Sequence, residues 1–320
     1  MAAILQSFQQ TFGAGLFGGL LAIGMYGLTT SQTYLYFVEY PKDETWTRIL
    51  VWALWALNTV HTALLVHLIY HYFIVNAFNA FELSQNVWSL PSSMVVHLII
   101  AFLVMIYFLG VIFLFCTRKL RWWLAIPNVC AILLHIGFGI ESIIHVFSTH
   151  SLVQVPVFTK TAFLPMVASQ AAADIVLASS LCFVLHDHRT SFRSTNSILH
   201  TLMIYAINRC LLTTGVAVCS LLMIGLKPAS MIYIGPEFLF AGLYTNALLT
   251  SLNSRRRIRD TPSSDYNSMQ LSDIPSDVMA MESQNNRASH RVDVAAMSPK
   301  TGSYDGVNSV DDLKQAMAIV

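Results

Sequence analysis

Charged side chains are scarce in this chain of 320 residues: Asp, Glu, Lys and Arg make up 11% of it, against roughly 25% in a typical soluble domain. Apolar residues account for 55%, and the mean hydropathy is +0.58. This composition excludes a water-soluble globular fold and excludes disorder over most of the chain. The net charge of +1 argues against nucleic acid as a partner, because a nucleic-acid-binding protein would carry a basic domain.

Motifs for several activities are also missing. The five cysteines have neither metal-finger nor redox spacing, and they imply no disulfide framework. No lysine lies inside a long apolar run, which excludes a retinal Schiff base, and no phosphate-binding loop, HExxH motif or nucleophile elbow occurs. These absences leave an enzymatic activity uncertain, favour a non-enzymatic role and predict no cofactor.

Long apolar stretches, in contrast, are abundant, and seven of them reach the roughly 20 residues that a helix needs to cross a bilayer. We therefore expect an all-α, seven-helix transmembrane bundle over residues 1–252. The first stretch contains a GxxxG pattern at Gly15 and Gly19, which permits close helix packing. The predicted helices lie near 12–38, 49–75, 93–116, 123–147, 162–186, 197–224 and 231–252.

Lys and Arg are distributed unevenly between the two sets of loops. If the N-terminus is outside, the outer flanks hold only Lys160 and Lys227, and the inner flanks hold eleven basic residues. The positive-inside rule therefore predicts an N-out/C-in orientation in the lipid bilayer. The plasma membrane is the default location, and an internal membrane is the alternative because no retention signal is readable.

Residues 253–320 differ in composition and predict a disordered cytosolic tail rich in Ser, Asp and Asn. The tail begins with a basic cluster that would attract anionic lipid of the inner leaflet, at Arg255, Arg256, Arg257 and Arg259. Three further positions resemble phosphorylation sites, which makes a cytosolic kinase a candidate partner: Thr261, Ser289 and Ser298.

Two charged residues fall near the middle of neighbouring helices. Asp174 lies 12 residues from either end of the fifth stretch, and Arg209 lies 12 residues from the inner end of the sixth. Charges in hydrocarbon need a partner, so we expect a buried Asp174–Arg209 ion pair. The pair can act as a structural clamp, as a gating lock or as the counter-ion of a ligand.

Histidines form a second polar group toward the outer leaflet. Three helices would bring five residues to this leaflet. The second contributes His67 and His71, the third His97, and the fourth Glu141 and His145. Imidazole and carboxylate ligands suit zinc with an open position, and such a site would support a metal-dependent membrane hydrolase. The same residues can instead sense protons, or they can simply face the lipid headgroups.

Four polar residues, among them Glu141 again, are candidates for a ligand pocket: Asn58, Glu141, Glu237 and Asn246. Glu237 stands out among them, because an unpaired carboxylate inside a membrane helix usually faces a cavity. Interhelical hydrogen bonding is the alternative explanation for the two asparagines.

Several runs of residues resemble a single family. They are Tyr26-Gly27 with Gln32, Tyr34 and Tyr36; Leu54-Trp55-Ala56-Leu57-Asn58-Thr59; Asp174 with Leu177 and Leu181; and Leu243 to Leu249 with Leu252-Asn253-Ser254-Arg255. Over residues 15–255 the chain resembles an uncharacterised basidiomycete family of multi-span membrane proteins, known only as a domain of unknown function. The resemblance implies a seven-span integral membrane protein of fungal origin, and it implies no activity and no site residues.

Helix number, orientation and the basic, Ser-rich tail together favour a receptor-like or sensory membrane protein, by analogy with other seven-span proteins. Two alternatives stay open. One is the metal-dependent hydrolase at the outer histidines, and the other is a small-solute transporter in which Asp174 and Arg209 form an alternating gate.

Overall fold

A computed structural model describes residues 2–115, 118–187, 193–227 and 230–259, and this part of the chain is almost entirely helical, without a β-strand. The long helices are α1 (Ala2–Glu39), α2 (Thr45–Tyr70), α4 (Ser89–Phe115), α5 (Arg118–Ser148), α6 (Leu164–Asp187), α7 (Arg193–Leu226) and α9 (Phe240–Arg259). The shorter elements are α3 (Ala80–Leu83), α8 (Ile234–Glu237), a 3₁₀ turn at Leu152–Phe158, and π-helical turns at His71–Val75 and Thr159–Phe163.

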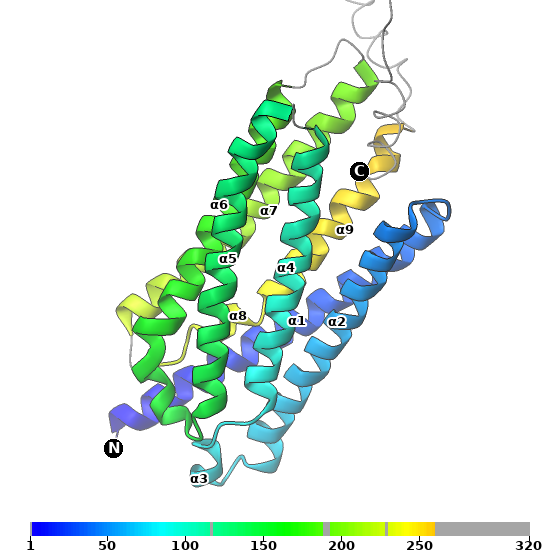
Figure 1. The fold of residues 1–320 in the computed structure, drawn as a ribbon. Helices are drawn as coiled ribbons and strands as arrows, with labels where there is room; N and C mark the ends of the chain where they lie inside the picture. Colours follow the sequence, from blue (N-terminus) through cyan, green and yellow to red (C-terminus); the bar gives the residue numbers. More distant parts are fainter. Residues whose placement is uncertain (1, 116–117, 188–192, 228–229, 260–320) are drawn as a thin grey trace, which may run out of the picture.

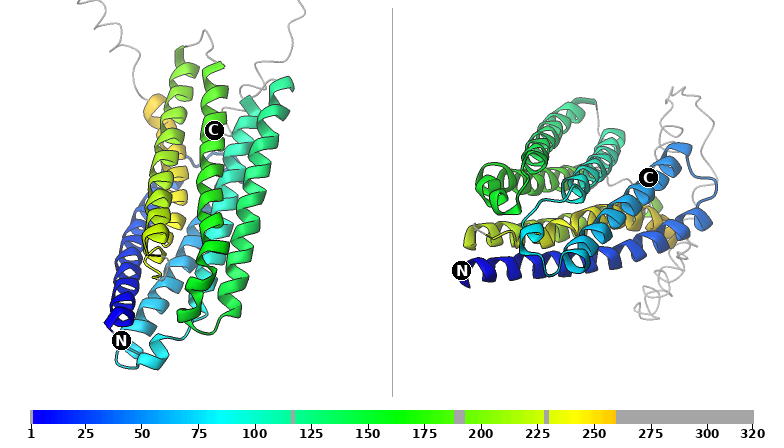
Figure 2. Two further views of the ribbon diagram at one scale, coloured as in Figure 1. Left: turned by 90° about the vertical axis from the view of Figure 1, so that its left-hand side faces the viewer. Right: turned by 90° about the horizontal axis from the view of Figure 1, so that it is seen from below.

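Six segments of the described chain are long and apolar enough to cross a membrane: Gln9–Glu39, Thr45–Val75, Ser89–Leu114, Leu120–Ser148, Leu152–Val184 and Ile207–Leu226. Successive long helices run in opposite directions and pack side by side (Figures 1 and 2). Many large apolar side chains on these helices face outward. The chain is therefore a multi-pass integral membrane protein, as its composition predicts.

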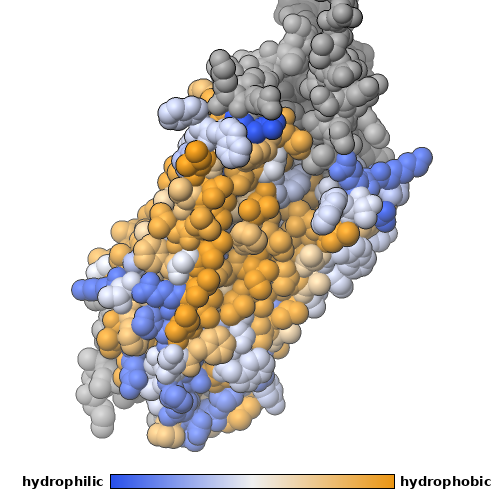
Figure 3. Space-filling view, in the orientation of Figure 1, coloured by the Kyte–Doolittle hydropathy of each residue, from blue (hydrophilic) through white to orange (hydrophobic). Residues whose placement is uncertain are grey.

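On the face drawn in Figure 3, an apolar band lies between two more polar ends. Exposed tryptophans lie near both ends: Trp88 precedes α4 at the end where α1 begins, and Trp46, Trp122 and Trp123 lie at the opposite end. Tryptophan is enriched where a membrane meets water, so these residues mark the two interfaces of the bilayer.

Two of the predicted ranges differ from the structure in more than their end residues. The fifth span begins at Leu152, because the 3₁₀ and π-helical turns before α6 extend its helical path. The predicted helix 231–252 is broken into α8 and α9. At the break, the Leu239 N–H donates to the Pro236 carbonyl at 3.0 Å, which is a tighter turn than an α-helix makes.

Side-chain hydrogen bonds join α1 to α9. The Asn246 Nδ2 donates to the Met25 carbonyl at 3.1 Å, and the Gln32 Nε2 donates to the Thr250 Oγ1 at 3.0 Å. The Asn253 Nδ2 in turn donates to the Gln32 carbonyl at 2.9 Å. Interhelical hydrogen bonds of this kind fix neighbouring helices in lipid, so α1 holds α9 laterally.

Helices α1 and α8 touch backbone to backbone at two glycines. A Cβ atom on Gly18 would overlap the carbonyl group of Gly235, and a Cβ atom on Gly235 would lie 2.5 Å from the Ala14 carbonyl oxygen. The nearest atoms to Gly15 and Gly19, the predicted GxxxG pair, belong to side chains. The contact that most needs glycine therefore uses Gly18, one residue away from the predicted motif.

Candidate functional site

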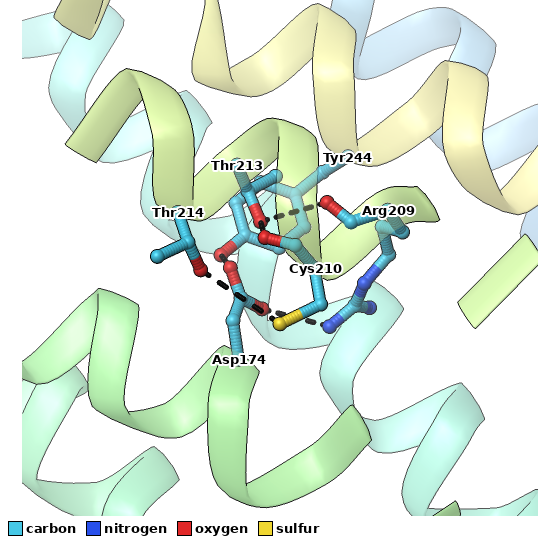
Figure 4. A network of polar contacts seen from close by, with 6 residues as sticks. All are labelled: Asp174, Arg209, Cys210, Thr213, Thr214 and Tyr244. Carbon is cyan, nitrogen blue, oxygen red and sulfur yellow. Dashed lines mark hydrogen bonds and ion pairs between the residues drawn. The ribbon is translucent and has the colours of Figure 1, made fainter. Parts of the chain in front are cut away.

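The two charged residues expected to pair are in contact at the centre of the bundle (Figure 4). The Arg209 Nη2 lies 2.7 Å from the Asp174 Oδ1, and the Tyr244 hydroxyl donates to the Asp174 Oδ2, also at 2.7 Å. All three side chains are buried. We call Asp174, Arg209 and Tyr244 the polar junction; it connects α6, α7 and α9.

Aromatic rings surround the guanidinium group of the polar junction. The Arg209 Cζ lies 4.6 Å from the centre of the Phe108 ring on α4 and 5.5 Å from the centre of the Tyr244 ring. Cation–π attraction of this kind is stronger in a desolvated site than at a surface. The Arg209 Nη1 is buried without a hydrogen-bond partner, so one face of the guanidinium has unused donors. The junction thus draws four helices together.

A second buried pair lies at the break between α8 and α9. The His97 Nδ1 on α4 is 3.1 Å from the Glu237 Oε1 at the end of α8. The imidazole stacks on the Phe240 ring, with 5.6 Å between ring centres and 11° between planes, and lies 6.3 Å from the Tyr244 ring. Tyr244 therefore touches both groups, and the two form one continuous polar region inside the bundle.

A small cavity adjoins the His97–Glu237 pair. Its volume is about 20 Å³, and its polar lining comes from His61, Ser93, His97, Tyr233 and Glu237. The His97 Nε2 is buried and has no hydrogen-bond partner, and the Glu237 Oε1 is buried with the His97 Nδ1 contact alone. Buried polar atoms that lack a partner are uncommon, and they often contact an ordered water molecule or an ion.

Two further buried polar residues border this region, and the sequence reasoning did not select them. His135 on α5 is buried, with His97 and the Met166 backbone as its polar neighbours. Gln170 on α6 is buried one turn before Asp174 and lies beside the Tyr244 hydroxyl. The signal that could have found Gln170 is its i, i+4 spacing from Asp174 on one helix face.

Residues 170–257 match a family of unknown function, DUF6534. No curated protein and no solved structure matches the chain. The matched segment runs from α6 into the last turns of α9, so it contains the whole polar junction together with Glu237. Helix α4, which supplies His97 and Phe108, lies outside it.

The five residues considered as a metal site do not meet. His67 and His71 stack on each other at 6.2 Å between ring centres, and Glu141 and His145 form a separate, partly exposed pair at 3.9 Å. His97 points instead to Glu237. Within the described chain, no three His, Cys, Asp or Glu side chains gather as metal ligands. These residues share a leaflet, but the His67–His71 pair, His97 and the Glu141–His145 pair lie on different helices, and their side chains do not converge.

The four pocket candidates also occupy different surroundings. Glu237 lines the cavity, whereas Glu141 lies on the outer surface of α5, where 44% of its side chain is exposed. The Asn58 Nδ2 donates to the Thr245 Oγ1 at 2.5 Å, and Asn246 bonds to α1 as described above. The two asparagines therefore serve interhelical hydrogen bonding, which was the alternative explanation.

The remaining predicted features lie beyond what the structure describes. Helix α9 reaches Arg259, but the side chains of Arg255, Arg256, Arg257 and Arg259 are outside the described part of the chain. Residues 260–320, with Thr261, Ser289 and Ser298, are outside it as well. Binding of anionic lipid and phosphorylation of the tail therefore stay predictions.

Proposed function

We propose that the protein is a receptor-like, sensory membrane protein of seven spans, with α8 and α9 together forming the seventh. One observation carries this proposal: the α8–α9 unit contacts both buried polar groups. Glu237 in α8 lies 3.1 Å from His97, and Tyr244 in α9 donates a hydrogen bond to Asp174. A change in the contacts of Glu237 therefore alters the position of Tyr244 and the strength of the polar junction.

The signal would travel along α9. Tyr244 lies seven positions after Glu237, in the second turn of α9. Helix α9 packs against α1, α2, α4 and α7, and it continues to the basic cluster at Arg255–Arg259. Coupling between the two sides of a membrane requires a structural element that has two positions and contacts at both of its ends. The α8–α9 unit would be that element. We propose that the polar junction keeps this element in its resting position.

Weakening the polar junction should move α9, and Tyr244→Phe is the mildest change that does so. It removes one hydrogen bond to a carboxylate, worth about 1.5–3 kcal/mol, and keeps the ring. We expect the ratio of the two conformations to change roughly tenfold or more. The measurement is the distance distribution between spin labels at Trp123→Cys on α5 and Ser254→Cys on α9, in a chain whose native cysteines are replaced.

Tyr26→Phe is the matched control for this experiment, because the Tyr26 hydroxyl lies 3.0 Å from the Thr59 Oγ1 and joins α1 to α2 away from the junction. It should leave the label distances unchanged. An unchanged distribution in Tyr244→Phe, in a folded protein, would contradict the proposal that the junction controls α9.

The proposed orientation, with the N-terminus outside and the C-terminus inside, has its own test. Ala77, before α3, and Lys42, between α1 and α2, are both exposed and lie at opposite ends of the bundle. An impermeant maleimide applied to intact cells should label Ala77→Cys strongly and Lys42→Cys weakly. The reverse pattern would place the basic flanks outside and would rule out the orientation.

The other two functions receive less support from the geometry. A metal-dependent hydrolase needs ligands that converge, and the outer histidines lie apart in separate pairs. A transporter of organic solutes needs a larger chamber than the two cavities beside α8, of about 20 and 40 Å³. We further propose a fungal source, the plasma membrane as location, and a tail that meets anionic lipid and a cytosolic kinase.

A further inference from the structure

We propose that the stimulus of this protein is the proton. The cavity beside α8 holds one water molecule, and the His97–Glu237 pair binds the proton. The inference rests on the sensory function proposed above and names its ligand. It depends on the size of the cavity, on the unpartnered His97 Nε2 in its wall, and on the position of Glu237 at the helix break.

The size of the cavity selects a very small occupant. About 20 Å³ is enough for one water molecule, which needs roughly 10–15 Å³ by the same measure. Binding sites for organic molecules measure about 300–1,000 Å³. In this conformation, therefore, the cavity beside the buried carboxylate has room for a water molecule and for no organic ligand.

The cavity wall offers the hydrogen-bond partners that such a water molecule requires. When the His97 Nδ1–H donates toward Glu237, the Nε2 has a free lone pair that accepts a hydrogen bond. The water can donate one hydrogen to this Nε2, which lacks a partner. The Ser93 hydroxyl already donates to the Leu90 carbonyl at 2.7 Å, so it can only accept.

The charged and titratable groups around the pair come from several helices. The nearest are His61 on α2, His135 on α5, Tyr233 before α8 and Tyr244 on α9. Beyond Tyr244 lie Asp174 on α6 and Arg209 on α7. Helix α1 packs on α8 and, over its described side chains, contributes nothing to the cavity lining. The Asp174 and Arg209 charges compensate each other, and the Tyr233 hydroxyl bonds to Thr159. Glu237 is thus left with His97 as its one ion-pair partner among the described residues.

The proton balance is simple. Without the extra proton, the pair is a neutral imidazole beside a carboxylate, with a net charge of −1. One proton from the aqueous phase brings the net charge to zero, either as imidazolium with carboxylate or as imidazole with carboxylic acid, and no other bond changes. A net charge inside hydrocarbon is costly, so proton binding strengthens the contact of α8 with α4, and proton release weakens it. Acid therefore favours the docked position of α8, and alkali favours its release.

The test uses the full chain in lipid nanodiscs with the label pair at Trp123→Cys and Ser254→Cys. We expect the ratio of the two distance populations to change roughly tenfold between about pH 8 and pH 5, because a single coupled proton allows up to tenfold per pH unit. Glu237→Gln, which keeps the shape and removes the charge, should hold the low-pH distribution at every pH. Glu141→Gln removes a partly exposed carboxylate that also pairs with a histidine, and it should respond as the native protein does.

Each outcome decides the inference. A native chain without a pH response overturns it, and so does a Glu237→Gln chain that responds like the native one. If Glu237→Gln does not fold, Glu237→Met, which also removes the carboxylate, replaces it, with loss of the pH response as the expected result and a native response as the overturning one. The proton inference can fail while the proposed sensory function holds. If pH has no effect on the label distances but Tyr244→Phe still shifts them, α9 moves and the proton is not the stimulus.

Discussion

Replacing Arg209 with methionine should lower the free energy of unfolding by about 3–5 kcal/mol, because the change leaves the Asp174 carboxylate buried without its cation. Asp174 is fully buried, and the Arg209 guanidinium 2.7 Å away is its ionic partner. The Tyr244 hydroxyl alone cannot compensate a full negative charge in hydrocarbon. Chemical or thermal unfolding of the detergent-solubilised protein measures the loss.

The control and the double variant make this prediction specific. Arg121 also places its guanidinium over an aromatic ring, 5.7 Å from the centre of Phe113, but it has no carboxylate partner in the described chain. Arg121→Met should therefore cost less than about 1 kcal/mol. Asp174→Asn combined with Arg209→Met should recover most of the stability, because the remaining buried groups are neutral. If the two losses simply add in the double variant, the two residues are not energetically coupled.

Much of the fold could be predicted from the sequence, because the bilayer imposes a minimum length on apolar helices. The second predicted range, 49–75, agrees closely with the observed span Thr45–Val75. The break between α8 and α9 escaped prediction because hydropathy cannot detect it: Phe238 and Leu239, the residues at the break, are as apolar as the helix around them. What breaks the helix is the tight turn after Pro236 and the packing of Gly235 on α1.

The candidate site was predictable in part, because the bilayer also restricts where charged side chains can lie. Asp174 and Arg209 are charged and lie at equal depth, so the need for a partner in lipid identifies both. Tyr244 was missed because a tyrosine in an apolar run looks like a packing residue, and its hydroxyl becomes informative only when the acceptor is known. His97 was placed among the outer histidines by its depth alone. Its direction toward Glu237 depends on how α4 is rotated, and one sequence does not specify that rotation.

Adding one methyl group at Gly18 should destabilise the protein by about 3 kcal/mol or more, at or above the upper end of what overpacking usually costs. The new Cβ atom of Gly18→Ala would overlap the carbonyl group of Gly235, and backbone cannot move aside as a flexible side chain can. Helix α8 would have to shift away from α1, so Glu237 should also lose its contact with His97. Unfolding measurements and the pH response of the α9 label distances should both report the change.

Gly24 provides the matched control on the same helix, because a Cβ atom there would have no neighbour within 4 Å. Alanine is favoured over glycine inside a helix by about 1 kcal/mol, so Gly24→Ala should stabilise the protein slightly. The two substitutions are chemically identical, and they are expected to change stability in opposite directions. If Gly18→Ala instead stabilises the protein as Gly24→Ala does, α1 and α8 do not meet backbone to backbone. The anchoring of the helix break that carries Glu237 would then need another explanation.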